Sequence, residues 1–271
     1  MLPAPSLFVI AAISQYAGAA LAVSLFAELP AASVAWARLA TAAAVLVTWR
    51  RPWRGAWSRR RLALTTAFGL ALAAMNVSFY LAIERLPLGT AVAIEFSGPV
   101  LVAAAGARRW RDAAALVLAL GGVLLLADVS WAGSPAGVLF ALAAAFFWGC
   151  YILLGVRVAS AGDGVASLAA AMAIGSVAFA PALAPGASPA LSDLRLLVLC
   201  VGVGILSSTI PYVLEQVALR RLRSSQFALL QSLLPATAAV VGLILLRQVP
   251  TPVEAVGILL VVAAVAVRTR E

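Results

Sequence analysis

Apolar residues dominate this chain in long blocks, which short arginine-rich or proline- and glycine-containing stretches separate. A helix needs about 20 predominantly apolar residues, with a range of roughly 17–25, to cross the hydrocarbon core of a bilayer. About ten blocks come close to this length. They cover residues 6–27, 31–48, 63–83, 88–107, 113–129, 135–157, 165–184, 195–217, 225–245 and 253–268. The pattern therefore predicts an all-α, polytopic membrane protein with about ten transmembrane helices.

The composition supports this prediction. Of the 271 residues, 64% are hydrophobic and 11% are charged, and the mean hydropathy is +1.08. Ordinary soluble domains are roughly 45–50% apolar and about 25% charged. The composition thus excludes a soluble enzyme, a disordered chain and a coiled coil. Because no positively charged region precedes the first block, we expect a retained helix there and not a cleaved signal peptide.

The arginines predict the orientation of the chain in the membrane. With both termini in the cytoplasm, the cytoplasmic segments hold six arginines at 50–61, three at 108–111, one at 157, three at 220–223 and two at 268–270. Only Arg85, Arg195 and Arg247 lie in the outer loops, as the positive-inside rule requires. The net charge of +9 therefore sets the orientation, and we expect no nucleic-acid partner. Four tryptophans in the cytoplasmic loops fit interfacial anchors: Trp49, Trp53, Trp57 and Trp110.

The residue inventory argues against catalysis. The chain has no histidine, and all 19 of its basic residues are arginine. Histidine-based acid–base chemistry and lysine Schiff bases are therefore excluded. Cys150 and Cys200 both lie inside apolar blocks, where cysteine behaves as a small buried hydrophobic residue. We expect neither a metal site nor a cofactor, and we do not expect an enzyme.

A weak internal repeat divides the chain into residues 1–129 and 135–271. A shift of about 136 positions aligns Pro99 with Pro235, Gly106 with Gly242, Gly121 with Gly257, Arg85 with Arg221 and Leu86 with Leu222. Five spans in each half would give the halves opposite orientations in the membrane, and the loop charges invert accordingly. This arrangement is typical of inverted-repeat transporters, which bind substrate near the midplane between the repeats. A channel or a sensor would leave the repeat unexplained.

Ionisable groups inside the membrane are functional candidates, because they are costly unless they face a cavity or a partner. Arg38, Glu95 and Glu215 are such groups. Pro99 follows Glu95 by four residues, and a helix proline leaves the carbonyl four residues earlier without an amide donor. Gln231 and Pro235 repeat this spacing in the ninth block. Each half therefore offers a polar side chain and a freed carbonyl near the midplane.

Each of these residues also has a plain structural interpretation. The prolines could be packing kinks, and Glu95 could form a structural ion pair with Arg38. Arg38 could equally brace the bundle, and Glu215 could pair with Arg220 at the cytoplasmic end. Pro211 frees the carbonyl of Ser207 in the same way as Pro99 frees that of Glu95. Four further polar residues could line a cavity or only bridge helices: Gln15, Tyr16, Asn76 and Tyr80.

Several stretches resemble the EamA family of the drug/metabolite transporter superfamily. They are SQYAGAALAVSLF (14–26), MNVSFYLAI (75–83), PLGTAVAIEFSGP (87–99) and ILSSTIPYVLEQVALRRL (205–222). The resemblance implies ten helices in two inverted repeats, a bacterial inner-membrane location and export of amino acids or related metabolites. It carries over to Glu95, Pro99, Asn76, Tyr80, Pro211 and Glu215. The chain departs from the family at Leu246 and Arg247, where many members have a Gly-Glu pair.

The resemblance implies an exporter of small amino acids, such as threonine and homoserine, and the inverted repeat and intramembrane carboxyl add alternating access in exchange for protons as an expectation. Glu95 and its freed carbonyl would bind the substrate ammonium, and Arg38 or donors near Gln231 would bind the carboxylate. The serious rival is a broader drug or metabolite exporter of the same superfamily. An intramembrane enzyme would need a catalytic histidine, cysteine or pair of acids at one membrane face, and the chain offers almost none. The expected partners are the bilayer, the substrate and protons, and a homodimer is left open.

Overall fold

The computed structural model describes residues 4–55, 57–104, 110–131, 133–160, 164–212, 214 and 233–269, and these residues form helices and connecting turns without a strand. The first half contains α1 (Ala4–Leu25), α2 (Ala31–Arg50), η1 (Pro52–Arg54), α3 (Arg59–Ile83), α4 (Leu88–Glu95), α5 (Ser97–Ala104) and α6 (Trp110–Trp131). The second half contains α7 (Pro135–Ser160), α8 (Gly164–Leu183), η2 (Pro185–Ala187), α9 (Pro189–Ser192), α10 (Leu194–Gly204), η3 (Ile205–Thr209), α13 (Leu234–Leu246) and α14 (Pro252–Thr269).

Six helical segments in the described part are long and apolar enough to cross a membrane. They are Ser6–Leu25, Ala31–Arg50, Arg59–Ile83, Pro135–Val158, Gly164–Leu183 and Leu194–Tyr212. Four shorter apolar helices coincide with the other blocks expected from the sequence: Leu88–Val102, Ala113–Leu126, Leu234–Leu246 and Pro252–Ala264. The prediction of an all-α chain built from apolar helices is thus confirmed.

Two helix boundaries differ from those expected. α3 begins at Arg59, four residues before the apolar block, because the Ser58 hydroxyl accepts a hydrogen bond from the Arg61 amide at 3.1 Å and caps the helix. The fourth block is interrupted at Phe96, since α4 ends at Glu95 and α5 begins at Ser97. The connection between α8 and α10 holds two short helices that were not expected, η2 and α9.

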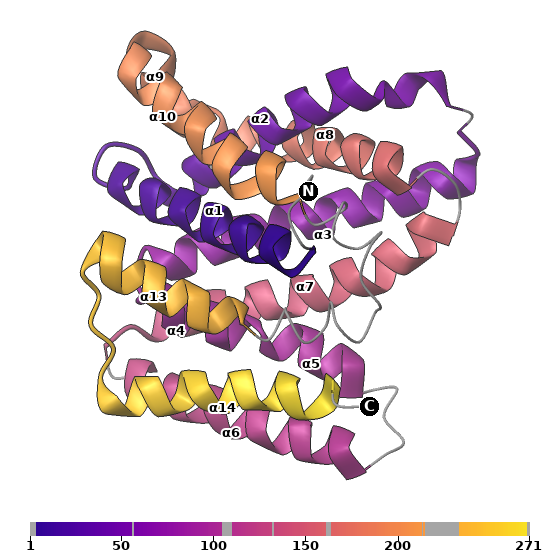
Figure 1. Ribbon diagram of the computed structural model, residues 1–271. Coiled ribbons are helices and arrows are strands. Elements are labelled where there is room, and N and C mark those ends of the chain that lie inside the picture. Colours follow the sequence, from indigo (N-terminus) through magenta and orange to yellow (C-terminus); the bar gives the residue numbers. More distant parts are fainter. Residues whose placement is uncertain are drawn as a thin grey trace.

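The helices lie side by side and reverse direction at two ends of the molecule (Figure 1). α3 packs along α7 and α8, α2 packs along α8, and α6 pairs with α14. α4 is enclosed between α7 and α13, and α1 packs on α10, η3 and α13. This arrangement places α1, α2, α3, α4 and α7 around the region that contains the intramembrane charges.

Small residues let the backbones approach closely where helices cross. A Cβ atom on Gly122 of α6 would lie 2.7 Å from the carbonyl oxygen of Gly257 on α14. Gly69 of α3 meets the Ala171 backbone of α8 in a similar way. Because lipid tails are as apolar as leucine, helices in a membrane associate through such close packing and not through a hydrophobic driving force.

Candidate functional site

The interruption between α4 and α5 places Glu95 at a helix end within the bundle. The amide of Phe96 donates to the Val92 carbonyl at 3.0 Å, and α5 then restarts at Ser97. Pro99 has no amide hydrogen, so the carbonyl of Glu95 lacks the donor that a continuous helix would provide. The side chain of Glu95 is only 8% exposed. The chain thus holds a carboxylate and a freed carbonyl together in the interior.

A cavity of about 60 Å³ lies beside Glu95. Its lining comes from five helices and consists of Gln15, Tyr16, Ala19, Arg38, Met75, Asn76, Phe79, Glu95 and Trp148. The volume is enough for a few water molecules, each of which needs about 10–15 Å³. Residues that the sequence singled out separately, namely Gln15, Tyr16, Arg38, Asn76 and Glu95, are therefore brought to one cavity.

Arg38 holds the bend of a neighbouring helix. Its Nη2 donates to the Ser207 carbonyl at 2.9 Å, and its Nε donates to the Ser208 hydroxyl at 2.8 Å. The Ser207 carbonyl lies four residues before Pro211 and so lacks an α-helical amide donor. The backbone of η3 is locally a π-helix there, which we call the π-turn. Arg38 therefore satisfies the carbonyl that Pro211 frees, with a charge-assisted bond of the stronger kind.

Glu95 and Arg38 share the cavity without forming an ion pair. Neither oxygen of Glu95 lies within 4.0 Å of the Arg38 nitrogens, and no hydrogen bond joins the Glu95 carboxylate to another described residue. The interpretation of the two residues as a structural ion pair is therefore wrong. Arg38 instead directs its Nε and Nη2 donors to the π-turn. The cavity therefore holds an acidic and a basic side chain that do not contact each other.

Tyr80 lies behind Arg38 and is not among the residues that line the cavity. The guanidinium carbon of Arg38 lies 5.5 Å from the centre of the Tyr80 ring, within the range of a cation–π interaction. The Tyr80 ring also meets Phe26 and Phe79 edge to face, at 6.1 and 6.0 Å between centroids. Its hydroxyl is buried without a hydrogen-bond partner among the described residues. The Tyr80 ring thus packs against the Arg38 guanidinium and can help to fix its position.

The π-turn is also tied to α1. The Ser14 hydroxyl donates to the Leu206 carbonyl at 2.8 Å, and the Ser207 hydroxyl donates to the Gln15 carbonyl at 3.2 Å. A Cβ atom on Gly18 would lie 2.8 Å from the Ser207 amide nitrogen, so only glycine fits at this crossing. The cavity wall formed by Gln15 and Tyr16 is therefore coupled to the bend that Arg38 holds.

Asn76 is anchored within its own helix. Its amide nitrogen donates to the Leu72 carbonyl at 2.8 Å, and Asn76 also lines the cavity. Trp148 was not predicted as a site residue, although it lines the cavity and meets Phe96 edge to face at 4.9 Å between centroids. From the sequence alone, an aromatic residue in an apolar block that lines a cavity cannot be distinguished from one that packs against a helix.

Two predicted site residues, Glu215 and Gln231, lie outside the described residues. Pro211 is buried and follows the π-turn. Pro235 lies in the first turn of α13, where a proline fits because its missing amide hydrogen would have no partner. Arg247, at the departure from the family pattern, caps α13 in the left-handed conformation with φ of 57°.

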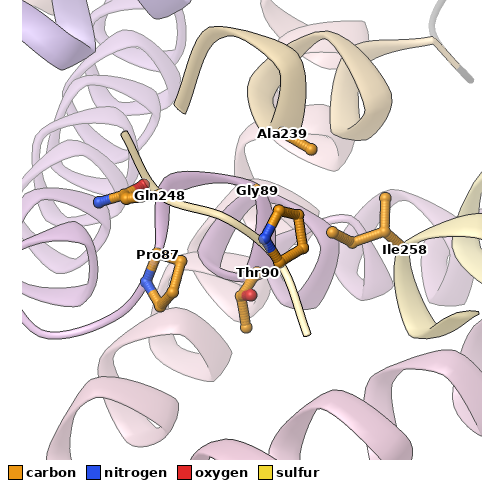
Figure 2. A pocket seen from close by; sticks show the side chains of 7 residues that line it. Pro87, Gly89, Thr90, Ala239, Gln248 and Ile258 are labelled. Atoms are coloured by element: carbon orange, nitrogen blue, oxygen red, sulfur yellow. The ribbon is translucent and has the colours of Figure 1, made fainter. Parts of the chain in front are cut away.

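A second junction joins the two halves where α4 begins (Figure 2). The Gln248 side-chain oxygen accepts a hydrogen bond from the Leu88 amide at 2.9 Å. The Thr90 hydroxyl donates to the buried carboxylate of Glu254 at 3.2 Å, and the same carboxylate accepts from the Thr251 amide. The gap between Pro87, Gly89, Thr90, Ala239 and Gln248 has a volume of about 10 Å³. Glu254 was not singled out from the sequence, although Thr251 and Glu254 have the spacing of a capping box.

Comparison with known proteins connects this arrangement to a family. Residues 135–270 match the model of the EamA-like transporter family. The chain is 38% identical over 262 residues to the threonine/homoserine exporter RhtA of Escherichia coli (strain K12), covering 95% of this chain and 88% of that protein. RhtA of Salmonella typhimurium (strain LT2) is 38% identical over 258 residues, covering 94% of this chain and 87% of that protein.

A crystal structure of another protein shares the fold with a TM-score of 0.62 and 19% sequence identity, covering 97% of this chain and 96% of that one. At this identity the likeness concerns the fold alone. The family match and the relatives are more specific, and they agree with the multi-pass helical architecture. The chain belongs to the EamA-like transporter family.

Proposed function

We propose that this protein exports small amino acids of the threonine and homoserine kind across the bacterial inner membrane, by alternating access and in exchange for protons. Its similarity to proteins named as threonine/homoserine exporters supports the substrate class. The observation that carries the proposal is the cavity between Glu95 and Arg38. It offers one acidic and one basic side chain that do not pair with each other.

A zwitterionic amino acid fits these two charges. The substrate ammonium would lie against the Glu95 carboxylate and its freed carbonyl. The substrate carboxylate would accept hydrogen bonds from Arg38, whose guanidinium has five N–H donors and uses two nitrogens for the π-turn. The Asn76 amide and the Gln15 side chain would bind the remaining polar atoms. Gln231 and Glu215 stay candidates from the sequence for the same site.

The cavity has a volume of about 60 Å³, whereas sites for drug-sized ligands usually have about 300–1,000 Å³. It must widen to take any substrate, and a small amino acid requires less widening than a drug-sized compound. Trp148 lines one side of the cavity and packs edge to face against Phe96. A large hydrophobic compound would require these side chains to move.

Alternating access rests on the inverted repeat of residues 1–129 and 135–271. Helices at equivalent positions of the two halves pack on each other, since α6 pairs with α14 and α4 with α13. Each half also has a proline in its fourth segment, Pro99 in α5 and Pro235 in the first turn of α13. In the proposed orientation both termini lie in the cytoplasm, and the halves rock about the cavity.

Transport of radiolabelled threonine and homoserine in proteoliposomes, with and without an imposed pH gradient, tests the proposal. We expect the gradient to drive both amino acids in the wild-type protein. Glu95→Gln should reduce gradient-driven transport at least tenfold, because the amide cannot exchange a proton or hold the ammonium by charge. Unchanged gradient-driven transport in this variant would remove Glu95 from the mechanism.

Glu84→Gln is the matched control, because Glu84 is an acidic residue that pairs with Arg85 at the end of α3, away from the cavity. It should transport like the wild type. Competition by hydrophobic cations, measured in the same vesicles, separates the two substrate classes. Strong competition by such cations and none by small amino acids would favour the broader drug exporter.

A further inference from the structure

The connection between α2 and α3 concentrates positive charge. Residues 50–61 contain six arginines, and the sequence has no acidic residue between Glu28 and Glu84. The two helices that flank the connection are candidate membrane spans, so the connection lies where they leave the membrane. In Figure 1 it forms the turn at the right of the molecule, at the same end as the C-terminus. A transport mechanism centred on the cavity makes no use of this surface.

This connection is folded and not an extended tail. Arg51 ends α2 in the left-handed conformation with φ of 46°, and its amide donates to the Val47 carbonyl. The Trp57 indole nitrogen donates to the Pro52 carbonyl at 2.9 Å. Arg61 stacks on the Trp57 ring at 4.2 Å and donates to the Ser167 hydroxyl of α8 at 3.0 Å. The connection is therefore closed on itself and fastened to a neighbouring helix.

Four arginines on this frame have exposed side chains: Arg51, Arg54, Arg59 and Arg60. None of the four forms an ion pair with an acidic group in the part of the chain that the structure describes. Guanidinium groups match phosphate geometry with paired N–H donors. We call these four residues the arginine surface. Because their charges are not paired with acidic groups of the described chain, they are available to an anionic partner.

Two tryptophans beside the arginine surface indicate what kind of anion it meets. Trp49 and Trp53 are 58% and 62% exposed, respectively. Amphipathic aromatic rings are enriched at the level of lipid headgroups, where one edge is apolar and the other is wet. The arginines next to them are therefore held at headgroup depth, which favours a lipid phosphate over a dissolved anion.

We propose that the arginine surface binds the phosphate headgroup of an anionic phospholipid, with Trp49 and Trp53 packing against the lipid next to it. A basic residue near an anionic membrane surface raises affinity about fivefold. Loss of three arginines should therefore weaken retention of anionic lipid on the order of 100-fold. The surface holds a structural lipid at the end of α2 and α3 and is separate from the transport cavity.

Native mass spectrometry and thermal unfolding of the full chain in detergent test this proposal. The probes are phosphatidylglycerol, phosphatidylcholine and inorganic phosphate. The test variant is Arg54→Gln/Arg59→Gln/Arg60→Gln. The control variant, Arg85→Gln/Arg195→Gln/Arg247→Gln, removes the same charge from residues outside this connection. A lysine variant, Arg54→Lys/Arg59→Lys/Arg60→Lys, keeps the charge and removes the paired donors.

We expect phosphatidylglycerol to stay bound to the wild type and to raise its unfolding temperature more than phosphatidylcholine does. The glutamine variant should lose this difference, the control should keep it, and the lysine variant should lie between them. Equal lipid retention in the test variant and the wild type would overturn the proposal. An equal loss in the control would also overturn it, because it would indicate a general charge effect. Equal stabilisation by inorganic phosphate would do the same, because it would indicate a simple ion site.

Discussion

At the scale of single residues, Arg38 contributes both to the fold and to the cavity. Its Nε and Nη2 hold the π-turn, and the side chain also lines the cavity opposite Glu95. Lysine has one ammonium with three donors and lacks the planar fork of arginine. Arg38→Lys should therefore raise the KM for homoserine at least tenfold and lower the thermal stability, because one ammonium cannot bind both the π-turn and the substrate carboxylate.

Ser208→Ala removes one acceptor of Arg38 and leaves the Ser207 carbonyl in place. A hydrogen bond to a charged group contributes about 1.5–3 kcal/mol, so stability should fall by an amount in this range while the KM changes less than threefold. Unfolding in detergent and transport kinetics in proteoliposomes measure the two effects. A rise in KM as large as that of Arg38→Lys would show that the π-turn and not the guanidinium itself controls binding.

Tyr80 gives a second prediction at this scale. Its hydroxyl is buried without a hydrogen-bond partner among the described residues, and an unsatisfied buried polar group costs about 1–3 kcal/mol. Tyr80→Phe removes the hydroxyl and keeps the ring against Arg38. We expect the thermal stability to stay equal or to rise by about 1 kcal/mol. Tyr80→Leu is the control that also removes the ring, and it should destabilise the protein. A clear loss of stability in Tyr80→Phe would contradict this account.

The sequence allowed some of these residues to be predicted and not others. Arg38, Glu95 and Asn76 could be singled out because polar groups in apolar segments are costly without a cavity or a partner. Trp148 could not be distinguished in this way, because a tryptophan packs well in lipid, against a helix or in a cavity wall. The absence of the Arg38–Glu95 ion pair could not be predicted either, because it depends on which acceptors the fold brings close to the guanidinium.

At the scale of helices, α6 and α14 form a pair whose contact depends on one of two adjacent glycines. A Cβ atom on Gly122 would lie 2.7 Å from the Gly257 carbonyl, whereas a Cβ atom on Gly121 meets nothing within 4 Å. Gly122→Ala should therefore destabilise the protein by about 1–3 kcal/mol through overpacking. Gly121→Ala should leave stability unchanged within about 1 kcal/mol. Unfolding of both variants in the same detergent compares them, and equal effects would show that the α6–α14 contact is not close.

Proline made the freed carbonyls predictable, because the lost amide donor is a local property. Pro99 and Pro211 predicted freed carbonyls at Glu95 and Ser207, where the structure has the break between α4 and α5 and the π-turn. The form of each interruption was not predictable. One is an ended helix and the other a π-turn, and the difference lies in their partners, since Arg38 is there to hold the Ser207 carbonyl.

At the scale of the whole molecule, long-range contacts join the halves. Arg38 meets Ser207 across 169 positions, and Leu88 meets Gln248 across 160 positions. A single sequence contains the periodicity that defines each helix but nothing that specifies which helices are neighbours. The position of the cavity therefore required the structure, whereas the membrane class of the chain followed from hydropathy alone.

The proposed orientation gives the last prediction. Arg54 follows α2 and Arg247 follows α13, and the arginine bias places them on opposite sides of the membrane. Cys150 and Cys200 are first replaced by serine, and Arg54→Cys and Arg247→Cys are made separately in that background. A membrane-impermeant maleimide should label the Arg247→Cys variant in intact cells whose outer membrane has been permeabilised.

The Arg54→Cys variant should react only after the inner membrane is disrupted, because the proposed orientation places its side chain in the cytoplasm. Arg195→Cys serves as the control, since Arg195 is exposed at the start of α10 and in the proposed orientation lies on the same outer side as Arg247. Labelling of Arg54→Cys and protection of Arg247→Cys would invert the orientation. Labelling of both in intact cells would contradict the odd number of crossings between them, and with it the inverted repeat on which alternating access rests.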